Sequence, residues 1–155
     1  MLDPCPMPGP TDAQRRQLDE HTAAELEFDV DATMRTVDDD PEYEWQPAGI
    51  RIRGREEIAR MYAAFLPRWK ELTDTAGLRF EIRTEFWSEA GRIREQVAFV
   101  RDESGAEIRH DFVVVVLFGE HGVKGERTHS SEEFARLTLG DYYDGLVAAA
   151  RPPTR

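Results

Sequence analysis

The sequence is nearly free of cysteine: its 155 residues include one, Cys5. A single cysteine cannot form a disulfide within the chain, and it cannot build a zinc site that needs several thiolates. This usage is typical of proteins from a reducing compartment, so we expect a cytoplasmic location.

Long hydrophobic runs are also missing. No apolar stretch approaches the roughly 18 residues that a membrane-spanning helix needs. The opening residues, MLDPCPMPGP, have neither the basic start nor the apolar middle of a signal peptide. We therefore expect no membrane partner.

Positive charge is scarce as well. Lysine and arginine together number 20 against 31 aspartates and glutamates, which gives a net charge of −11 and a pI near 4.8. Most of such a surface repels polyanions, so the composition excludes nucleic acid as an expected partner.

The sequence does contain enough apolar material for one folded domain. Hydrophobic residues make up 40% and charged residues 33%, which is ordinary for a globular protein and too apolar for a disordered one. The proline-rich residues 1–10 and 151–155 lack apolar periodicity. We therefore expect flexible ends around a single domain over residues 11–150.

The first half of this domain carries helical patterns. A helix capped at Thr11 or Asp12 is predicted first, and a second, short helix begins near Asp29. A third helix is predicted from Arg55, and it should end or kink at Pro67.

Strand patterns surround and follow the third helix. Before it, a short hairpin is predicted around a proline turn; after Gly77, long alternating segments indicate a meander, and a last helix is capped at Ser130 or Ser131. The strand segments are EYEW, IRIR, LRFEIRTEFW, RIREQVAFVRD, RHDFVVVVLFGE and VKGERTHSS. The predicted class is α+β, a cone-shaped roll of helices packed on a strongly curved, largely antiparallel sheet.

Two long segments carry a family resemblance: DVDATMRTVDDDPEYEWQPAGIRIRGREEIARMY and FGEHGVKGERTHSSEEFARLTLG. They resemble the nuclear transport factor 2-like superfamily, and within it most closely the SnoaL-like polyketide cyclases and the ketosteroid isomerases. The resemblance implies a cone with an internal cavity, a small-molecule ligand and a homodimer. Its motifs indicate the fold, and none is specific for one reaction.

The resemblance also places the family's catalytic positions on this sequence. The isomerases' carboxylate base falls on Trp45, and their oxyanion-stabilising acid falls on Val114. Both acids are missing, so steroid isomerisation by the usual pair is not expected. The first-helix tyrosine that donates to the oxyanion in that family falls on His21.

Strand alternation adds two candidates for the cavity. If Val114 faces inward, His110 on the same strand does too. On the middle strand the apolar-rich phase turns Glu95 inward, between hydrophobic neighbours. Burial of an unpaired carboxylate is costly, so Glu95 either has a partner or belongs to a solvated face.

The last strand offers a further pair. The resemblance turns Glu126 and Thr128 inward, although the alignment needs a one-residue gap there. A register slip of one residue would bring Arg127 and His129 inward instead.

Two chemistries suit the set His21, His110, Glu95 and Glu126. A histidine can move a proton near neutral pH, and a neighbouring carboxylate fixes its tautomer. Alternatively, two histidines and a carboxylate can hold a divalent metal. We favour proton transfer by His21 and Glu126, because the candidate ligands are scattered and form no short metal motif. No metal and no cofactor are expected.

Aromatic residues are numerous enough to wall the cavity for a flat, apolar ligand, although many could simply fill the core. The expected ligand-binding residues are Trp45, Tyr62, Phe65, Phe86, Phe99, Phe112, Val114 and Thr128. Trp87 lies on the charged phase of its strand. It should therefore meet solvent or the second copy of a homodimer.

Three functions follow from this pattern. The first is an isomerase, cyclase, dehydratase or hydrolase that acts on a small, largely apolar and possibly polycyclic molecule by acid/base catalysis. The second is a module of the same fold that binds an apolar ligand without turnover. The third is a protein adaptor that uses the sheet face. Polar groups inside the cone favour the enzyme.

Overall fold

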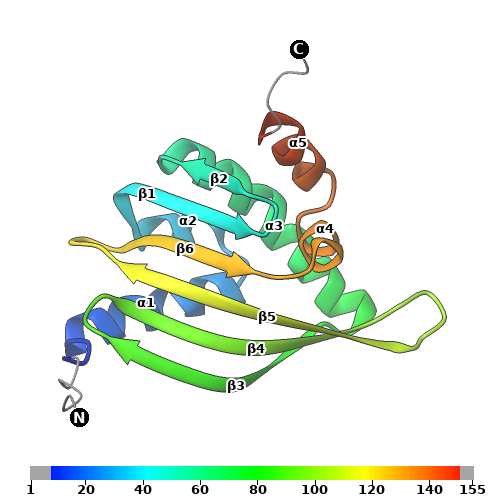
Figure 1. The fold of residues 1–155 in the computed structure, drawn as a ribbon, viewed down its shortest axis with the longest axis horizontal. Coiled ribbons are helices and arrows are strands. Elements are labelled where there is room, and N and C mark those ends of the chain that lie inside the picture. The colour runs from blue at the N-terminus through cyan, green and yellow to red at the C-terminus, as the bar shows by residue number, and fades with distance from the viewer. Residues whose placement is uncertain (1–7, 151–155) are drawn as a thin grey trace, which may run out of the picture.

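A computed structural model of the chain describes residues 8–150 and shows helices laid against one curved sheet (Figure 1). The helices are α1 (Asp12–Leu26), α2 (Val30–Arg35), α3 (Arg55–Ala76), α4 (Glu132–Leu139) and α5 (Asp141–Ala150). The strands are β1 (Val37–Gln46), β2 (Ile50–Arg53), β3 (Arg79–Ser88), β4 (Gly91–Arg101), β5 (Glu107–Phe118) and β6 (Val123–His129). The sequence positions predicted to form flexible ends lie mostly outside the described residues.

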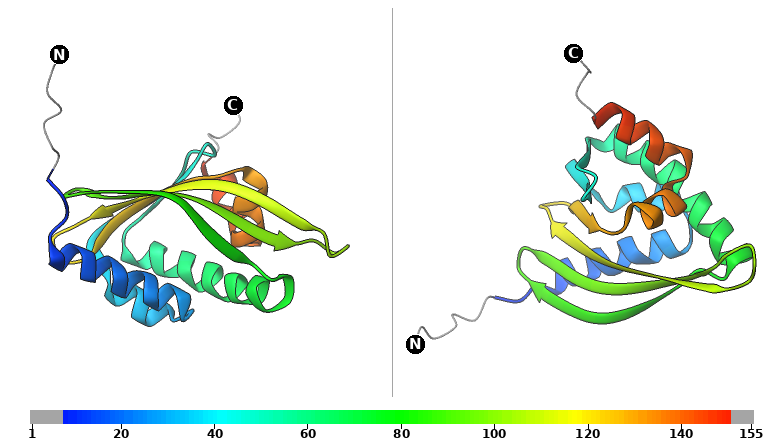
Figure 2. Two further views of the ribbon diagram at one scale, coloured as in Figure 1. Left: turned by 90° about the horizontal axis from the view of Figure 1, so that it is seen from below. Right: turned by 45° about the vertical axis from the view of Figure 1, so that its right-hand side comes forward.

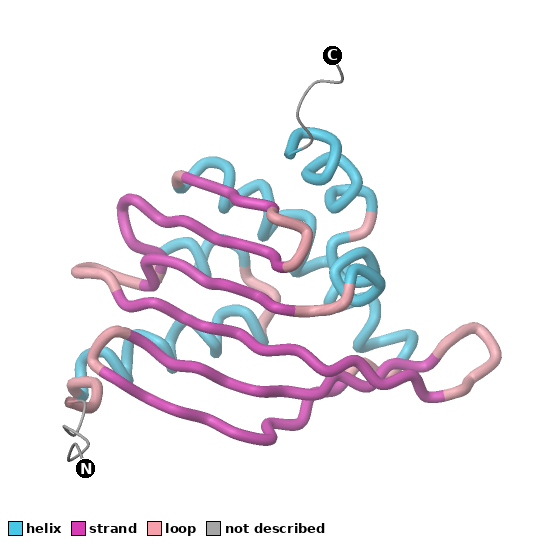
Figure 3. Tube along the Cα trace, in the orientation of Figure 1, coloured by secondary structure: helices cyan, strands magenta, loops and turns pink. Residues whose placement is uncertain are grey.

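The six strands form one sheet in the order β2, β1, β6, β5, β4, β3 (Figure 3). Only the pairing of β1 with β6 is parallel, and the other four pairings are antiparallel. Seen from the side, α1, α2 and α3 lie together under the concave face of the sheet (Figure 2). The predicted α+β cone is confirmed.

The helix boundaries follow local chemistry. The Thr11 hydroxyl accepts from the backbone N–H of Gln14, and the Gln14 side chain accepts from the N–H of Thr11, so α1 begins in a capping box. Ser131 caps α4 by accepting from the N–H of Phe134. Both caps are among those predicted.

Helix α3 does not end at Pro67, which was one of the two alternatives predicted there, but continues through it to Ala76. Its apolar spacing runs on through Leu66 and Leu72, which are buried. The packing of both halves on the core outweighs the hydrogen bond that proline removes. A fifth helix, α5, was not predicted; it buries Tyr143 beside α4.

Strand β3 contains an irregularity that decides which side chains face the helices. Ile82 lies opposite Gln96, but Thr84 lies opposite Glu95, so Arg83 is an extra residue in the ladder. A bulge of this kind turns every later side chain to the other face. The prediction that Phe86 faces inward is therefore wrong.

None of the helices between residues 8 and 150 combines the length and the apolar character that a membrane span requires.

Candidate functional site

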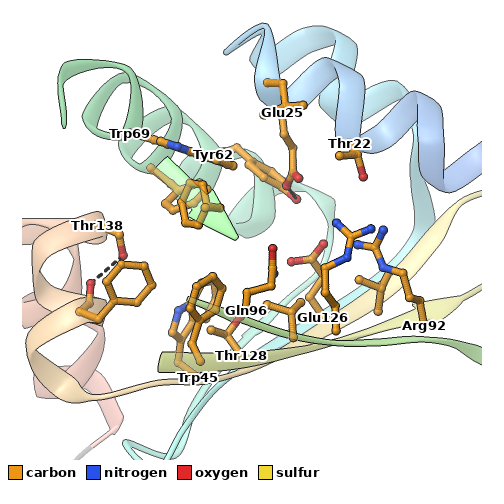
Figure 4. Close-up of a pocket in the computed structure, with 18 of the residues that line it drawn as sticks. Thr22, Glu25, Trp45, Tyr62, Trp69, Arg92, Gln96, Glu126, Thr128 and Thr138 are labelled. Carbon is orange, nitrogen blue, oxygen red and sulfur yellow. Dashed lines mark hydrogen bonds between the residues drawn. The ribbon is translucent and has the colours of Figure 1, made fainter. Parts of the chain in front are cut away.

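A cavity of about 250 Å³ lies between the concave face of the sheet and helices α1, α3 and α4 (Figure 4). One end is apolar and the other is polar. Its walls are formed by Thr22, Glu25, Leu26, Trp45, Met61, Tyr62, Phe65, Trp69, Phe80, Ile82, Arg92, Arg94, Gln96, Phe112, Val114, Val116, Glu126, Thr128, Phe134 and Thr138.

The apolar end is built from aromatic rings that pack on one another. The Trp69 ring lies 5.2 Å from the rings of both Phe65 and Phe80, and the Phe112 ring lies 5.0 Å from that of Phe134 (distances between ring centroids). These contacts hold the rings in fixed orientations. The result is a preformed surface that suits a flat ligand.

The polar end is centred on Glu126, whose side chain is 16% exposed. Glu126 Oε1 lies 3.3 Å from Nε2 of His21, and Glu25 Oε1 lies 3.4 Å from the same nitrogen. The imidazole thus faces two carboxylates at once. Figure 4 shows Glu25, Glu126 and the guanidinium of Arg92 converging on this end of the cavity.

His21 itself is 1% exposed and does not line the cavity. Its Nδ1 lies 2.7 Å from the Thr36 hydroxyl, which donates its own proton to the carbonyl of Thr33 at 2.6 Å. Thr36 must therefore accept from His21, so Nδ1 carries a proton. Nε2 is left to face Glu25 and Glu126, which do line the cavity.

Two tyrosines complete the hydrogen-bond network. The Tyr62 hydroxyl donates to Glu25 Oε1 at 2.9 Å and lies 3.2 Å from His21 Nε2. The Tyr43 hydroxyl lies 3.1 Å from that of Tyr62. Burial raises the pKa of both tyrosines well above 10, and the negative charges of Glu25 and Glu126 add to the shift. Both therefore remain neutral hydrogen-bond donors.

The two carboxylates change the charge state of His21. Burial alone would lower the pKa of His21, but the charge of Glu25 and the hydrogen bonds with Glu126 and Glu25 outweigh burial. Together they raise the pKa from 6.5 to about 10. The imidazole is then a cation at neutral pH.

Glu126 is shifted in the same direction. Burial and the charge of Glu25 raise its pKa above the ordinary 4.5, while the hydrogen bond and charge of His21 and the charge of Arg92 lower it. The net shift is upward, toward the range in which a carboxylate can both take and return a proton.

The fold explains why these groups meet. His21 and Glu25 are one helical turn apart on α1, so they share a face. Glu126 lies opposite Tyr43 in the parallel β1–β6 pair. The cavity holds Glu126 and Thr128, and Arg127 instead lies 3.7 Å from Glu44. The inward phase expected for Glu126 is thus the one that the structure has.

Most of the expected ligand-binding residues do line the cavity. These are Trp45, Tyr62, Phe65, Phe112, Val114 and Thr128. The cavity also contains Glu25 and Arg92, which the sequence reasoning missed. The signal for Glu25 was available in its four-residue spacing from His21, whereas Arg92 was hidden by the wrong phase for β4.

Three expected site residues lie elsewhere. Glu95 is on the outer face, 45% exposed and 3.9 Å from Arg83, because the inner face of β4 carries Arg92, Arg94 and Gln96. Phe99 belongs to the same outward phase, and Arg79 covers its ring. Phe86 is 64% exposed as a result of the β3 bulge. The inward placement of all three was wrong.

His110 is buried on the predicted side of β5 but is not part of the cavity wall. Its ring stacks on Phe134, with centroids 5.1 Å apart and an angle of 28° between the rings. Phe134 lines the cavity, so His110 packs behind the wall and outside the His21–Glu126 cluster.

Trp87 also departs from its predicted position. Beyond the bulge it lies opposite Arg92, on the inner face. Arg15 of α1 covers its ring at 4.6 Å, and its ring lies 6.3 Å from that of Phe118. Trp87 thus packs between sheet and helix, and it cannot form the outer-face dimer contact that was expected of it.

Within residues 8–150, two groups of side chains have the composition of a metal site. His21, Glu25 and Glu126 each offer an atom within 4.8 Å of the others, and so do Asp38, Asp39 and His121. In the first group the His21 imidazole already forms ion pairs with both carboxylates. The Arg92 cation lies at the same end of the cavity. The second group lies largely at the surface.

Comparisons with solved structures agree on the fold, whereas two other comparisons found no match. No family model matches the sequence, and no curated protein matches it significantly. An NTF2-like protein of unknown function from Cytophaga hutchinsonii superposes with a TM-score of 0.60 at 14% identity, over 76% of this chain and 99% of its own. An NTF2-like protein of unknown function from Burkholderia pseudomallei gives 0.60 at 12% identity, over 84% and 99%.

A third solved structure adds a ligand. It is a protein with a ketosteroid isomerase-like fold from Catenulispora acidiphila in complex with trimethylamine. Its TM-score is 0.52 at 16% identity, over 88% of this chain and 97% of its own. The narrower SnoaL-like resemblance stays a prediction. The chain has the nuclear transport factor 2-like fold.

Proposed function

We propose that this protein is an enzyme that binds a small, largely apolar molecule in the cavity and moves a proton on it, with Glu126 as the proton carrier. The observation that carries the proposal is the position of Glu126: its carboxylate lines the cavity and lies 3.3 Å from the buried His21. A carboxyl group with a raised pKa is suited to take a proton from carbon and return it.

The neighbouring groups have supporting roles in this proposal. His21 is a positioning residue, because its cation lies behind the cavity wall, pairs with Glu126 and lowers the pKa of the Glu126 carboxyl. Thr36 fixes the imidazole ring, and Tyr62 holds Glu25 by a hydrogen bond. None of these roles requires a cofactor.

The size and the lining of the cavity narrow the range of ligands that can bind. Its volume of about 250 Å³ is below the roughly 300–1,000 Å³ common for pockets that hold drug-sized ligands. The aromatic rings of Trp69 and Phe80, which both line the cavity, favour an apolar body that can pack against them. We therefore propose a ligand of one or two rings, whose reaction is an isomerisation or a related cyclisation, dehydration or hydrolysis.

A binding module without turnover is the second candidate. It is favoured by the apolar residues Trp45 and Val114, which occupy the two positions of the ketosteroid isomerases' acids and both line the cavity. In that case the His21 cluster would serve only to recognise a polar group.

We also propose a homodimer and a cytoplasmic location. The outer face of the sheet exposes an apolar pair, Phe86 at 64% and Ile93 at 46%, which lie opposite each other in β3 and β4. Val115 follows opposite Ile93 on β5. This row of residues replaces Trp87 as the expected contact between two copies.

Exchange of carbon-bound protons in D2O tests proton transfer without knowledge of the natural substrate. The probe is 2-tetralone, a flat two-ring ketone with acidic protons next to its carbonyl. We expect the wild type to accelerate exchange and Glu126→Gln to lose about 10²-fold or more of that acceleration. Nuclear magnetic resonance follows the loss of the proton signal.

Glu95→Gln is the matched control, because it makes the same substitution on the outer face. It should keep the wild-type rate. If Glu126→Gln exchanges the probe as fast as the wild type, Glu126 is not the proton carrier. If the folded wild type binds the probe without accelerating exchange, the binding module becomes the better account.

A further inference from the structure

Arg92 lines this cavity with a guanidinium group whose Nε has no hydrogen-bond partner among the described residues. Arg92 is only 7% exposed, and its Nε is fully buried without a hydrogen-bond partner among residues 8–150. The side chain belongs to the cavity wall, next to Glu126 (Figure 4). A buried cation without an anionic partner is costly, and such a group in a cavity wall is a candidate for ligand binding.

The nearby carboxylates are already engaged. Arg94 bonds with Glu85 through its Nε at 2.6 Å, and the Trp87 indole N–H donates to the other oxygen of Glu85 at 2.6 Å. Arg92 instead lies with its guanidinium 5.6 Å from the centre of the Trp87 ring. Among the described residues no carboxylate comes within ion-pair distance of Arg92.

We infer that the ligand of this cavity carries a carboxylate on its apolar body and that Arg92 binds this carboxylate. The inference rests on the proposed function only in that it concerns the same cavity. Burial and the charge of Arg94 lower the pKa of Arg92, and the charge of Glu126 offsets this in part. A bound anion would restore the balance by supplying the missing negative charge.

The geometry favours a carboxylate over a phosphate. Arg94 is held by Glu85, so Arg92 is the one cavity-lining arginine without an ion-pair partner among residues 8–150. Its planar fork matches the two oxygens of a carboxylate. Glu25 and Glu126 lie at the same end and would repel a dianion more strongly than a monoanion. The aromatic walls accept the remainder of the molecule.

Calorimetry with two probes of the same shape tests this inference. The probes are 2-naphthoate, which carries a carboxylate, and 2-naphthamide, which is neutral. We expect the wild type to bind the acid about 10–100-fold more tightly than the amide. Arg92→Met should abolish this preference and leave amide binding unchanged.

Arg83→Met is the matched control, because it removes the same charge from the outer face, where Arg83 lies near Glu95 and Asp111. It should keep the preference for the acid. Equal binding of the two probes by the wild type, including no measurable binding of either, would overturn the inference. So would an Arg92→Met variant that keeps the preference. The wild-type comparison holds even if that variant fails to fold.

Glu126→Gln separates this inference from the proposed function. It removes a negative charge from the cavity wall, so it should strengthen binding of 2-naphthoate while it slows the catalysed proton exchange of 2-tetralone. If Glu126→Gln does not slow exchange but the wild type prefers 2-naphthoate, the proposed function is contradicted and the carboxylate site stands. If Glu126→Gln slows exchange but the wild type does not prefer 2-naphthoate, the carboxylate site is contradicted and the proposed function stands.

Discussion

At the scale of single residues, the central feature is a histidine with carboxylates on one side and a hydroxyl on the other. His21 is enclosed by Glu25, Glu126, Tyr62 and Thr36. Its cation is stabilised by the fold and would be exposed in the unfolded chain. The charge state of this one side chain therefore links stability to pH.

The sign of that link follows from the raised pKa. His21 binds its proton more tightly in the folded state, so its contribution is fully present below pH 6.5 and is lost as the pH rises toward about 10. We expect the free energy of unfolding of the wild type to fall more than that of His21→Gln between about pH 7 and about pH 9.5. Urea unfolding at several pH values measures the difference.

The same comparison in a Glu126→Gln background removes the titration of Glu126 from the result. The wild-type slope should still exceed the slope of the histidine variant, because Glu25 still faces the imidazole. Parallel pH curves for the two proteins in both backgrounds would show that His21 is neutral in the folded state.

Sequence reasoning at this scale found half of the polar cluster. His21 and Glu126 came from the resemblance, since each occupies a position with a counterpart in the family. Glu25 and Arg92 were not identified through the resemblance. Their place in the site depends on helix spacing and on the phase of β4, and the phase was assigned from hydrophobicity. The assignment assumed that the more hydrophobic phase of a strand faces inward. In β4 the polar phase faces inward instead, because Arg92, Arg94 and Gln96 line the cavity.

At the scale of elements, the bulge at Arg83 decides the composition of the site. It brings Glu85 and Trp87 to the inner face, where Glu85 pairs with Arg94, and Arg92 is left without a carboxylate partner in the described part of the chain. Alternation along the sequence predicts the face of a side chain only while the ladder is regular. No glycine or proline marks Arg83 as an extra residue, so the bulge was not predictable from the pattern.

The stability effect of replacing Trp87 tests the bulge in β3. Because it packs against Arg15 and Phe118 on the inner face, Trp87→Ala should lower the free energy of unfolding by about 2 kcal/mol or more. Arg83→Ala should change it by about 0.5 kcal/mol at most, since that side chain is half exposed. Denaturant unfolding measures both. A Trp87→Ala cost as small as that of Arg83→Ala would place the tryptophan on a solvated face.

At the scale of the whole molecule, the order of helices and strands was predictable because each segment carries its own period. The change from helical to alternating spacing after Gly77 predicted the meander, and the structure has β3 to β6 there. The fifth helix was missed, because tertiary packing stabilises it more than local signals do.

We predict that two copies of the molecule form a homodimer through the outer face of the sheet. A row formed by exposed Phe86, exposed Ile93 and half-buried Val115 crosses three strands of the outer face. We expect the protein to sediment as a dimer at micromolar concentration and Phe86→Asp to shift it to monomer, since a charge in an apolar contact is strongly unfavourable. Glu81→Gln, also on β3 and exposed, should leave the dimer intact.

A monomer at micromolar concentration would contradict this prediction. So would a dimer that Phe86→Asp does not weaken, because the contact would then lie on another surface. Neither outcome changes the account of the cavity, which is formed within one chain.

In the proposed function, the fold tunes the pKa of Glu126 for proton transfer through His21, and a titration of the Glu126 carboxyl measures this tuning. Carbon-13 resonance of labelled glutamate, assigned with Glu126→Gln, gives its pKa. The account predicts a value above the ordinary 4.5 in the wild type and a still higher value in His21→Gln, because the imidazolium that lowers it is gone. A Glu126 that titrates at the ordinary value in both proteins would contradict the account.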